Sequence, residues 1–224
     1  MPPLNIISYM AEHYFTAAPT AAAQERTVRY SARDFDYAVT ASDGTFSAHG
    51  LDKGTAVLLA KAPRAELAAG GVTEQGGERT PLLVDVGCGW GPIALALARE
   101  YPQARVLGVD VNERAMDLAR RNATALRLEN LQIKPADEAA VEIRERGEKI
   151  DLIWSNPPIR IGKEQLHELL VAWLDLLSPQ GAAYWVVQKN LGADSLTAWL
   201  NEQGYPSEKV ASQKGFRLIR SSRE

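Results

Sequence analysis

The sequence is poor in the residue types that build disulfide frameworks and structural metal sites. Its 224 residues include one cysteine, Cys88, and three scattered histidines, His13, His49 and His167. A single thiol excludes a disulfide within the chain and any zinc site that needs several cysteines, and the histidines lack metal-ligand spacing. We therefore expect a protein that holds no metal.

Long apolar segments and an excess of positive charge are also absent. No apolar run approaches the ~18–20 residues that are needed to span a bilayer. The first five residues lack the basic and apolar regions of a signal peptide. The 25 basic and 28 acidic side chains give a net charge of −3, which excludes binding of nucleic acid through bulk charge but not through a local basic face. We expect a cytoplasmic protein without membrane contact.

A stretch rich in glycine and polar residues, 69–78, indicates a loop or linker. It separates an N-terminal third from a C-terminal two-thirds with a different pattern. We expect residues 1–78 to form an extension that packs on a catalytic domain of residues 79–224, because the extension does not look able to fold alone.

Within the extension, the pattern predicts a β-hairpin followed by a helix. Apolar and polar residues alternate over 35–40, a turn follows at 42–44, and residues 45–47 resume an extended run. Asp52 is of a type that caps helices, and it precedes an apolar helical face over 53–61.

Beyond residue 78, strand and helix patterns alternate. The expected strands are 82–86, 105–109, 131–133, 150–154, 182–187, 209–212 and 216–219. The expected helices are 92–100, 113–125, 138–146, 164–177 and 195–202. Such alternation gives parallel pairing with right-handed crossovers, and the last strand pair is too closely spaced for a helix between them. We predict an α/β fold with a Rossmann-like, seven-stranded, mostly parallel sheet, one antiparallel edge strand, helices on both faces, and the N-terminal hairpin and helix.

A glycine loop over 85–92 follows the first of these strands and opens a helix. Gly87 and Gly89 permit close approach, and free amides at the helix start favour an anionic group of a ligand. Asp110 ends the next strand, where an acid commonly accepts hydrogen bonds from ribose hydroxyls. This combination predicts a nucleoside ligand, and Pro92 departs from the nicotinamide fingerprint. The alternative is an ordinary turn with Asp110 as a helix cap.

The turn Asn156-Pro157-Pro158 follows the fourth strand, at the sheet edge where ligands of open α/β folds bind. Each proline excludes the helical region for the residue before it, and neither donates a backbone hydrogen bond. The stiff turn presents two acceptors, the Asn156 side-chain oxygen and the Pro157 carbonyl, to a substrate NH₂ group. Such alignment can supply up to ~7–11 kcal/mol of barrier reduction. The alternative is a loop that only ends the strand.

Together these residues resemble the class I S-adenosylmethionine-dependent methyltransferases. The loop 85–91 is similar to their first motif, Asp110 with 111–115 to their ribose-binding acid and following helix, and 155–158 to the catalytic turn of members that methylate amino groups. A narrower resemblance, to the small-domain 16S ribosomal RNA guanine-N2 methyltransferases, rests on segments 46–47, 51–55, 156–163 and 187–193. The resemblance extends from about residue 13 to 220.

The resemblance implies S-adenosylmethionine as the cofactor and gives residues their roles. The implied cofactor contacts are Asp85, Gly87, Cys88, Gly89, Asp110, Val111, Asp137 and Asn156. Among them, Asp110 would bind the ribose, Val111 the adenine face and Asp137 the adenine amino group. The implied catalytic turn is Asn156, Pro157, Pro158 and Ile159, with Arg160 and Lys163 beyond it as phosphate contacts. Many relatives carry an aromatic residue in place of Ile159, so stacking of a flipped base on a ring there is lost.

We therefore expect methyl transfer to an exocyclic amino nitrogen, guanine N2 in small-subunit ribosomal RNA, with ribosomal RNA or the 30S subunit as partner. The open alternatives are methylation of a protein glutamine amide or a small-molecule amine, a non-catalytic nucleotide-binding module, and, more distantly, a nicotinamide oxidoreductase. Further candidate phosphate contacts are Arg29, Arg33, Lys189, Arg217 and Arg220. Residues 13–15 and Phe46 form a candidate lid.

Overall fold

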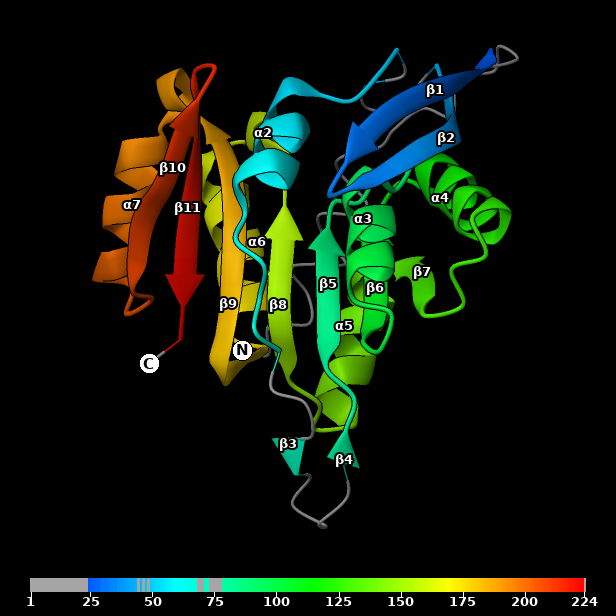
Figure 1. Ribbon diagram of the computed structural model, residues 1–224. Helices are drawn as coiled ribbons and strands as arrows, with labels where there is room; N and C mark the ends of the chain where they lie inside the picture. The colour runs from blue at the N-terminus through cyan, green and yellow to red at the C-terminus, as the bar shows by residue number, and fades with distance from the viewer. Residues whose placement is uncertain are drawn as a thin grey trace.

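The computed structural model describes residues 24–43, 45, 47, 49–67, 71–72 and 78–223, so the lid expected from residues 13–15 and Phe46 lies outside the described residues. Its centre is a seven-stranded sheet in the order β10-β11-β9-β8-β5-β6-β7 (Figure 1). The strands are β5 (Leu82–Val86), β6 (Arg105–Asp110), β7 (Leu131–Pro135), β8 (Ile150–Ser155), β9 (Leu177–Gln188), β10 (Ser207–Gln213) and β11 (Phe216–Ser222).

Strands β5 to β9 pair in parallel, whereas β11 runs antiparallel to both of its neighbours, β9 and β10. The predicted α/β fold, with a Rossmann-like, mostly parallel sheet and antiparallel pairing at one edge, is confirmed. Parallel neighbours need crossover connections, and helices supply them. The helices that follow β5 to β9 in turn are α3 (Pro92–Glu100), α4 (Glu113–Ala125), α5 (Ala136–Glu145), α6 (Lys163–Leu174) and α7 (Ala193–Glu202).

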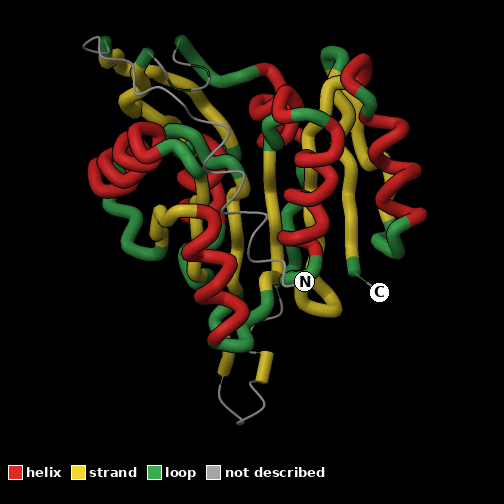
Figure 2. The backbone as a smooth tube through the Cα atoms, turned by 180° about the vertical axis from the view of Figure 1, so that it is seen from behind, coloured by secondary structure: helices red, strands yellow, loops and turns green. Residues whose placement is uncertain are grey.

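Each face of the sheet buries its own hydrophobic core. In β9, Tyr184 and Val186 face the core that includes α3 and α4, whereas Ala183, Trp185 and Val187 face the core that includes α5, α6 and α7. This alternation follows from the pleat of a strand, which points successive side chains to opposite faces. Figure 2, seen from behind, shows the helices that cover the second face. Burial on both faces explains why these strands are almost continuously apolar in sequence.

The N-terminal hairpin pairs β2 (Phe35–Ser42) with β1 (Glu25–Ala32), so the expected pairing of residues 35–40 with 45–47 was wrong. The turn consists of Arg33 and Asp34, which have positive φ of 54° and 66°. Two such residues form the type of turn that matches the twist of a hairpin, which glycine, asparagine and aspartate favour. Asp34 suits this turn, but Arg33 does not, and no glycine follows, so the turn was concealed in the sequence.

The predicted helix after the hairpin is confirmed as α2 (Lys53–Lys61). Its N-cap is Asp52, whose Oδ2 accepts hydrogen bonds from Gly54 N at 2.7 Å and Thr55 N at 3.1 Å. Buried Val57 and Leu58 join the core on the α3 and α4 face of the sheet. In Figure 1, α2 and the hairpin lie at the end toward which β5 and β8 point, which is the end where α/β proteins bind ligands.

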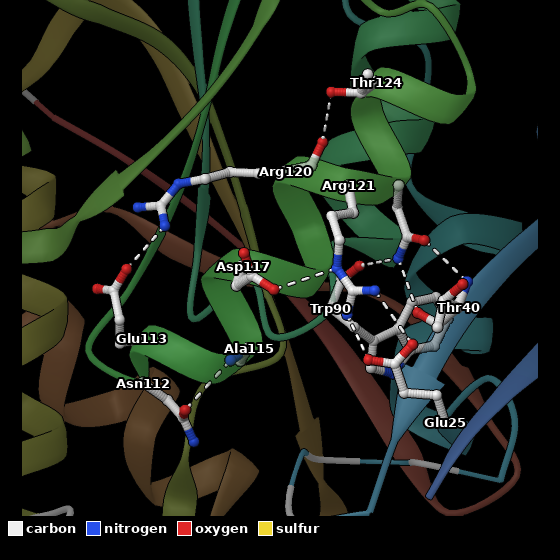
Figure 3. A network of polar contacts seen from close by, with 11 residues as sticks. Glu25, Thr40, Trp90, Asn112, Glu113, Ala115, Asp117, Arg120, Arg121 and Thr124 are labelled. Atoms are coloured by element: carbon white, nitrogen blue, oxygen red, sulfur yellow. Dashed lines mark hydrogen bonds and ion pairs between the residues drawn. The ribbon is translucent and has the colours of Figure 1, made fainter. Parts of the chain in front are cut away.

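A buried asparagine attaches the hairpin to the rest of the molecule. Asn122 of α4 accepts a hydrogen bond from Thr40 N at 2.8 Å and donates to Thr40 O at 2.9 Å and Trp90 O at 3.0 Å. Nearby, Arg121 of α4 pairs with Glu25 of β1 (Figure 3). The hairpin, α4 and the glycine loop are therefore joined by direct hydrogen bonds.

The stretch 69–78, expected to be a loop, carries two very short strands. Strands β3 (Gly71–Val72) and β4 (Glu78–Arg79) pair antiparallel over two residues each. They lie at the end of the sheet opposite to the hairpin and α2 (Figure 1). The division of the chain into an extension of residues 1–78 and a catalytic domain of residues 79–224 stays a prediction.

Several helix boundaries differ from their expected positions by one to three residues, and the largest difference is at the end of α6. The helix predicted over 164–177 ends at Leu174, and Leu177 already begins β9. Leu174, Leu176 and Leu177 are all buried, so the apolar pattern continues across the junction and conceals it. Within the part of the chain that the structure describes, no helix is long and apolar enough to cross a membrane, and no cluster of metal-ligating side chains is present.

Candidate active site

A cleft of about 590 Å³ lies at the carboxyl ends of β5, β6 and β8. Three segments that are far apart in sequence form its walls: the glycine loop, the end of β6 and the turn after β8. Nine of the predicted site residues line it: Gly87, Cys88, Gly89, Asp110, Val111, Asn156, Pro157, Pro158 and Ile159. The cleft therefore has the position that the order of the strands favours for a ligand site.

The glycine loop turns sharply around the end of β6. Gly87 and Gly89 have positive φ of 77° and 55°, a conformation that side chains disfavour. The amides of Gly87 and Cys88 both donate to Val109 O at 2.9 Å, and the amide of Gly89 donates to Asp110 Oδ2 at 2.8 Å. The expectation that these amides are free for an anionic group was wrong, because the neighbouring strand end already accepts their hydrogen bonds.

Asp110 lies at the end of β6 and faces the cleft. Its Oδ1 accepts from Val111 N at 2.8 Å and Asn112 N at 2.9 Å, in addition to the Gly89 bond on Oδ2. Burial raises the pKa of the Asp110 carboxyl, and the three amide bonds oppose that effect. A carboxylate offers about four acceptor positions, so capacity remains on Oδ2 for a ligand hydroxyl.

Asp85 was predicted to contact the cofactor, but it does not line the cleft. It is fully buried beneath the loop, where its Oδ2 accepts from Ala94 N at 2.9 Å in the first turn of α3. Burial, reinforced by the neighbouring charge of Asp110, raises the pKa of the Asp85 carboxyl well above its ordinary value. The observed contacts make Asp85 a support of the glycine loop and the helix start.

The remaining residues on this side differ in their access to the cleft. Val111 lines it, whereas Asp137, in the first turn of α5, does not; its neighbour Ala136 does. Cys88 is buried, and burial raises the pKa of its thiol well above the ordinary value. A thiol in that state is a poor nucleophile, so Cys88 is a small residue that fills the loop.

The Asn156-Pro157-Pro158 turn is fixed to elements on both sides. Ser155 Oγ donates to Val86 O at 2.6 Å, which attaches the turn to β5. Asn156 Nδ2 donates to Asp52 Oδ2 at 2.8 Å and to Thr55 Oγ1 at 3.1 Å. Helix α2 of the N-terminal part therefore contacts the predicted catalytic turn directly.

Sequence reasoning missed several residues that line the cleft: Ser47, Asp52, Thr55, Trp90, Gln188, Leu191 and Phe216. Asp52 was assigned as a helix cap only, although the resemblance included its segment. Phe216 opens β11, and no local pattern places it beside the Asn156 turn. Its Cε1 lies 3.0 Å from where a Cβ on Gly54 would be, so its ring packs against the start of α2.

Two candidate phosphate contacts are engaged within the protein. Arg33 forms an ion pair with Glu100, and their side chains are 8% and 6% exposed. Arg217 pairs with Asp194 and is 18% exposed. The buried pair withdraws Arg33 from solvent, so its prediction as a phosphate contact was wrong, whereas that of Arg217, whose partner is 64% exposed, stays a prediction.

The other basic candidates lie nearer to solvent. Lys163 and Lys189 are exposed, at the start of α6 and in a short helical turn after β9. Arg29 lies on β1 and Arg220 on β11, and neither lines the cleft. Arg160 follows the catalytic turn, but its side chain lies outside what the structure describes.

A second, smaller cavity of about 290 Å³ adjoins the cleft. The two share Ile159 and Leu191, and Leu191 is 51% exposed. Lys163 and His167 also line the small cavity. His167 stacks on Trp199, with ring centroids 3.5 Å apart. The face beside the catalytic turn thus combines an exposed apolar side chain with a cationic one.

The sequence is similar to a known protein family over most of its length. The family model named "Methyltransferase small domain" matches residues 36–220. A protein of Bacillus subtilis (strain 168), named "Uncharacterized protein YbxB", is 29% identical over 214 residues, which cover 96% of this chain and 100% of that protein.

Two other relatives match over shorter segments. A release factor glutamine methyltransferase of Xylella fastidiosa is 46% identical over 78 residues, covering 34% of this chain and 26% of that protein. A ribosomal RNA small subunit methyltransferase C of Hahella chejuensis is 38% identical over 122 residues, covering 54% of this chain and 30% of that protein. The chain therefore spans less than a third of the length of either relative.

Among solved structures, a 16S rRNA N2 methyltransferase of T. thermophilus in complex with AdoMet and guanosine superposes with a TM-score of 0.73. The sequences are 22% identical, and the match covers 93% of this chain and 53% of that one. The chain thus has the fold of about half of that longer protein.

Proposed function

The chain belongs to the methyltransferase small domain family, whose methyl donor is S-adenosylmethionine, and we propose that it methylates an exocyclic amino nitrogen of RNA. The proposed target is guanine N2 in small-subunit ribosomal RNA. The observation that carries the proposal is the Asn156 turn: Asn156 lines the cleft, and Asp52 and Thr55 engage its NH₂ group, which leaves its side-chain oxygen to accept from a ligand.

The residues on the glycine-loop side fit the cofactor. A Cβ at Gly89 would meet no atom within 4 Å, so the loop leaves open space there. Asp110 retains acceptor capacity for a ribose hydroxyl, and Val111 and Ala136 offer apolar contact for an adenine ring. S-adenosylmethionine supplies a methyl group bonded to a positively charged sulfur. Asp110 and Val111 would hold the nucleoside part of that molecule, and Gly87 and Gly89 would lie along its amino-acid part.

On the acceptor side, Asn156 Oδ1 and the Pro157 carbonyl would each accept a hydrogen bond from the substrate NH₂ group. This fixes the nitrogen and favours a pyramidal geometry with its lone pair aimed at the methyl carbon. The lone pair would form the new N–C bond as the C–S electron pair leaves with sulfur. The methylated nitrogen is then cationic and acidic, so its extra proton is lost to solvent without a strong base in the site.

Three observations support an RNA substrate. Relatives named as ribosomal RNA methyltransferases match in sequence over half of this chain and in fold over most of it. Ile159 and Phe216 line the cleft and offer apolar contact to a base that has left its stack. Lys163 and Lys189 are exposed near the same opening and can contact phosphates.

The test is transfer of a labelled methyl group to ribosomal RNA, supplied free or in 30S particles, followed by nucleoside mass spectrometry. We expect N2-methylguanosine, and the Asn156→Ala variant should form much less of it while it still binds S-adenosylmethionine. Label on another nucleoside would show that guanine N2 is not the target. No label in RNA with either substrate, from a protein that binds the cofactor, would reject the RNA proposal.

A second candidate is methylation of a protein glutamine amide. It is favoured by the similarity over 78 residues to a release factor glutamine methyltransferase. A planar amide NH₂ group presents the same two hydrogens to the Asn156 turn as a guanine amino group does. One assay distinguishes the two candidates when the enzyme is supplied with an extract that contains both ribosomes and translation factors. Label in protein would support the glutamine candidate, and label in RNA would support the first.

A further inference from the structure

The contact between Asp52 and Asn156 joins residues 104 positions apart in the sequence. A carboxylate can only accept hydrogen bonds, so the atom of the Asn156 amide that faces Asp52 must be the nitrogen. The amide orientation is therefore fixed, because in the reversed orientation the amide oxygen would face a carboxylate oxygen with no hydrogen between them. The 2.8 Å distance between Asp52 Oδ2 and Asn156 Nδ2 is that of a good hydrogen bond.

Both hydrogens of the Asn156 NH₂ group have partners. One is directed to Asp52 Oδ2 at 2.8 Å and the other to Thr55 Oγ1 at 3.1 Å. An amide has two donor hydrogens and one acceptor oxygen, so only Oδ1 remains for a ligand in the cleft. The asparagine therefore presents an acceptor and no donor to a substrate.

Asp52 is itself held in place by the helix that it caps. The same Oδ2 accepts from Gly54 N at 2.7 Å and Thr55 N at 3.1 Å. The approach of this helix start to Asn156 is so close that a Cβ on Gly54 would lie 3.2 Å from Asn156 Oδ1 and 2.9 Å from Asp52 Oδ2. The position of the carboxylate is thus determined by the start of α2 and not by a flexible side chain alone.

We infer that Asp52 is a positioning residue for methyl transfer, which selects the orientation of the Asn156 amide and thereby restricts the acceptor to groups that donate hydrogen bonds. The inference rests on the proposed function. Without Asp52, the amide can turn by half a rotation and present its NH₂ group to the substrate NH₂ group. Two donors then face each other, and the substrate nitrogen is no longer held on the line of attack.

The inference also makes α2 a part of the active site. The helix does not supply an atom to the reaction, but its N-cap residue decides which atom of the catalytic turn meets the substrate. The acceptor class follows: a nitrogen that carries two hydrogens is favoured over an unprotonated ring nitrogen or a carbonyl oxygen, which offer only lone pairs to the Asn156 oxygen.

The first test needs no substrate. In ¹H–¹⁵N NMR spectra of the full chain, the Asn156 side-chain NH₂ signals, assigned with Asn156→Ala, should shift in Asp52→Asn. Exchange of those hydrogens with solvent should accelerate by roughly tenfold or more, as expected for loss of a charge-assisted bond. Unchanged Asn156 signals in folded Asp52→Asn would overturn the inference.

The matched control is Asp151→Asn. Asp151 also accepts from a backbone amide, Leu82 N at 2.9 Å, and pairs with Arg79, but it lies at the amino end of β8, away from the cleft. It should leave the Asn156 signals unchanged. If Asp52→Asn does not fold, Asp52→Ser replaces it, because serine also caps helices and is too short to span to Asn156.

The second test is a double-mutant cycle that compares the kcat of Asp52 and Asn156 variants, with the acceptor that the wild type methylates. Asp52→Asn should lower kcat by roughly 10- to 100-fold, the size of effect expected when an outer residue that orients a functional group is changed, and leave the Kd for S-adenosylmethionine unchanged. In the Asn156→Ala background, the same change should cause no further loss of kcat. Independent losses that multiply would mean that Asp52 acts on stability and not through Asn156. A wild type without activity on RNA would refute the proposed function, whereas the NMR test would still decide the role of Asp52.

Discussion

Arg33 of the hairpin turn and Glu100 of α3 form an ion pair inside the molecule, with only 8% and 6% of their side chains exposed. Arg33 also donates to Ala62 O at 2.7 Å, at the C-terminal end of α2, and its guanidinium lies 5.1 Å from the Trp154 ring centroid. One side chain therefore joins the hairpin, two helices and the sheet.

We predict that breaking this pair destabilises the protein strongly. Arg33→Met should lower the free energy of unfolding by about 3 kcal/mol, because the buried Glu100 carboxylate loses its buried partner and keeps only the exposed Arg64, at 3.2 Å. The double variant Arg33→Met with Glu100→Gln should recover part of that loss. Urea unfolding measures both effects, and a loss below 1 kcal/mol in the single variant would contradict the buried pair.

We predict that removing the Asn122 side chain, which attaches the hairpin to α4, also destabilises the protein. Its side chain bonds both backbone groups of Thr40 and the carbonyl of Trp90, so Asn122→Ala leaves three backbone groups without these partners. We expect a loss of about 2–3 kcal/mol in the free energy of unfolding. In Asn122→Asp, the acceptor for Thr40 N is kept and the two donors are lost, so it should also be destabilised. A neutral result for both variants would mean that water replaces the asparagine.

The alternating strands and helices of the sheet domain could be predicted, because apolar residues recur at the spacing typical of each element. Helices α3 and α4 were predicted with the bounds that the structure gives, 92–100 and 113–125. The hairpin partner was not, because Arg33 in the turn adopts a left-handed conformation that its residue type does not indicate, and Asp34 alone was too weak a turn signal.

For the candidate site, the sequence predicted the residues that local motifs carry and missed those that only the fold brings near. The glycine loop and the Asn156 turn were recognisable as strand ends followed by turns. That Asp52 bonds Asn156 depends on a contact over 104 positions, and that Phe216 lines the same cleft depends on how the sheet folds. The engaged amides of Gly87 and Gly89 could not be foreseen either, because their acceptors belong to the neighbouring strand.

Asp110 gives a direct prediction for the cofactor. Asp110→Ala should weaken S-adenosylmethionine binding by about 1.5–3 kcal/mol in calorimetry, because hydrogen bonds to a charged acceptor are lost. The variant also releases Gly89 N, Val111 N and Asn112 N, so its folding is checked by thermal unfolding. Asp137→Ala is the comparison, and a larger effect there than at Asp110 would reverse their proposed roles.

His167 should titrate below its ordinary pKa of about 6.5. Burial lowers the pKa of His167, and the positive charge of Lys163 adds to the effect. The unfolded chain then binds the proton first, so this residue's contribution to stability is present above pH 6.5 and is lost as the pH falls below it. An NMR titration measures the pKa directly. Trp199→Ala, which exposes the ring, should raise it more than Lys163→Met does; a wild-type value above 6.5 would contradict the prediction.

The exposed lysines near the cleft should determine how RNA binding responds to salt. Lys163 lines the small cavity beside the catalytic turn, and Lys189 follows Gln188 of the cleft wall. If each contacts one phosphate, Lys163→Ala and Lys189→Ala should each reduce the slope of log K against log salt by roughly 0.7–0.9. Lys149→Ala is the matched control, because that exposed lysine directly precedes β8, at the amino end of the strand and away from the cleft. Equal slopes for all three variants would mean that RNA binds to another face of the molecule. A reduced slope only at Lys163 and Lys189 would mean that the RNA backbone lies along the opening that Ile159 and Leu191 border.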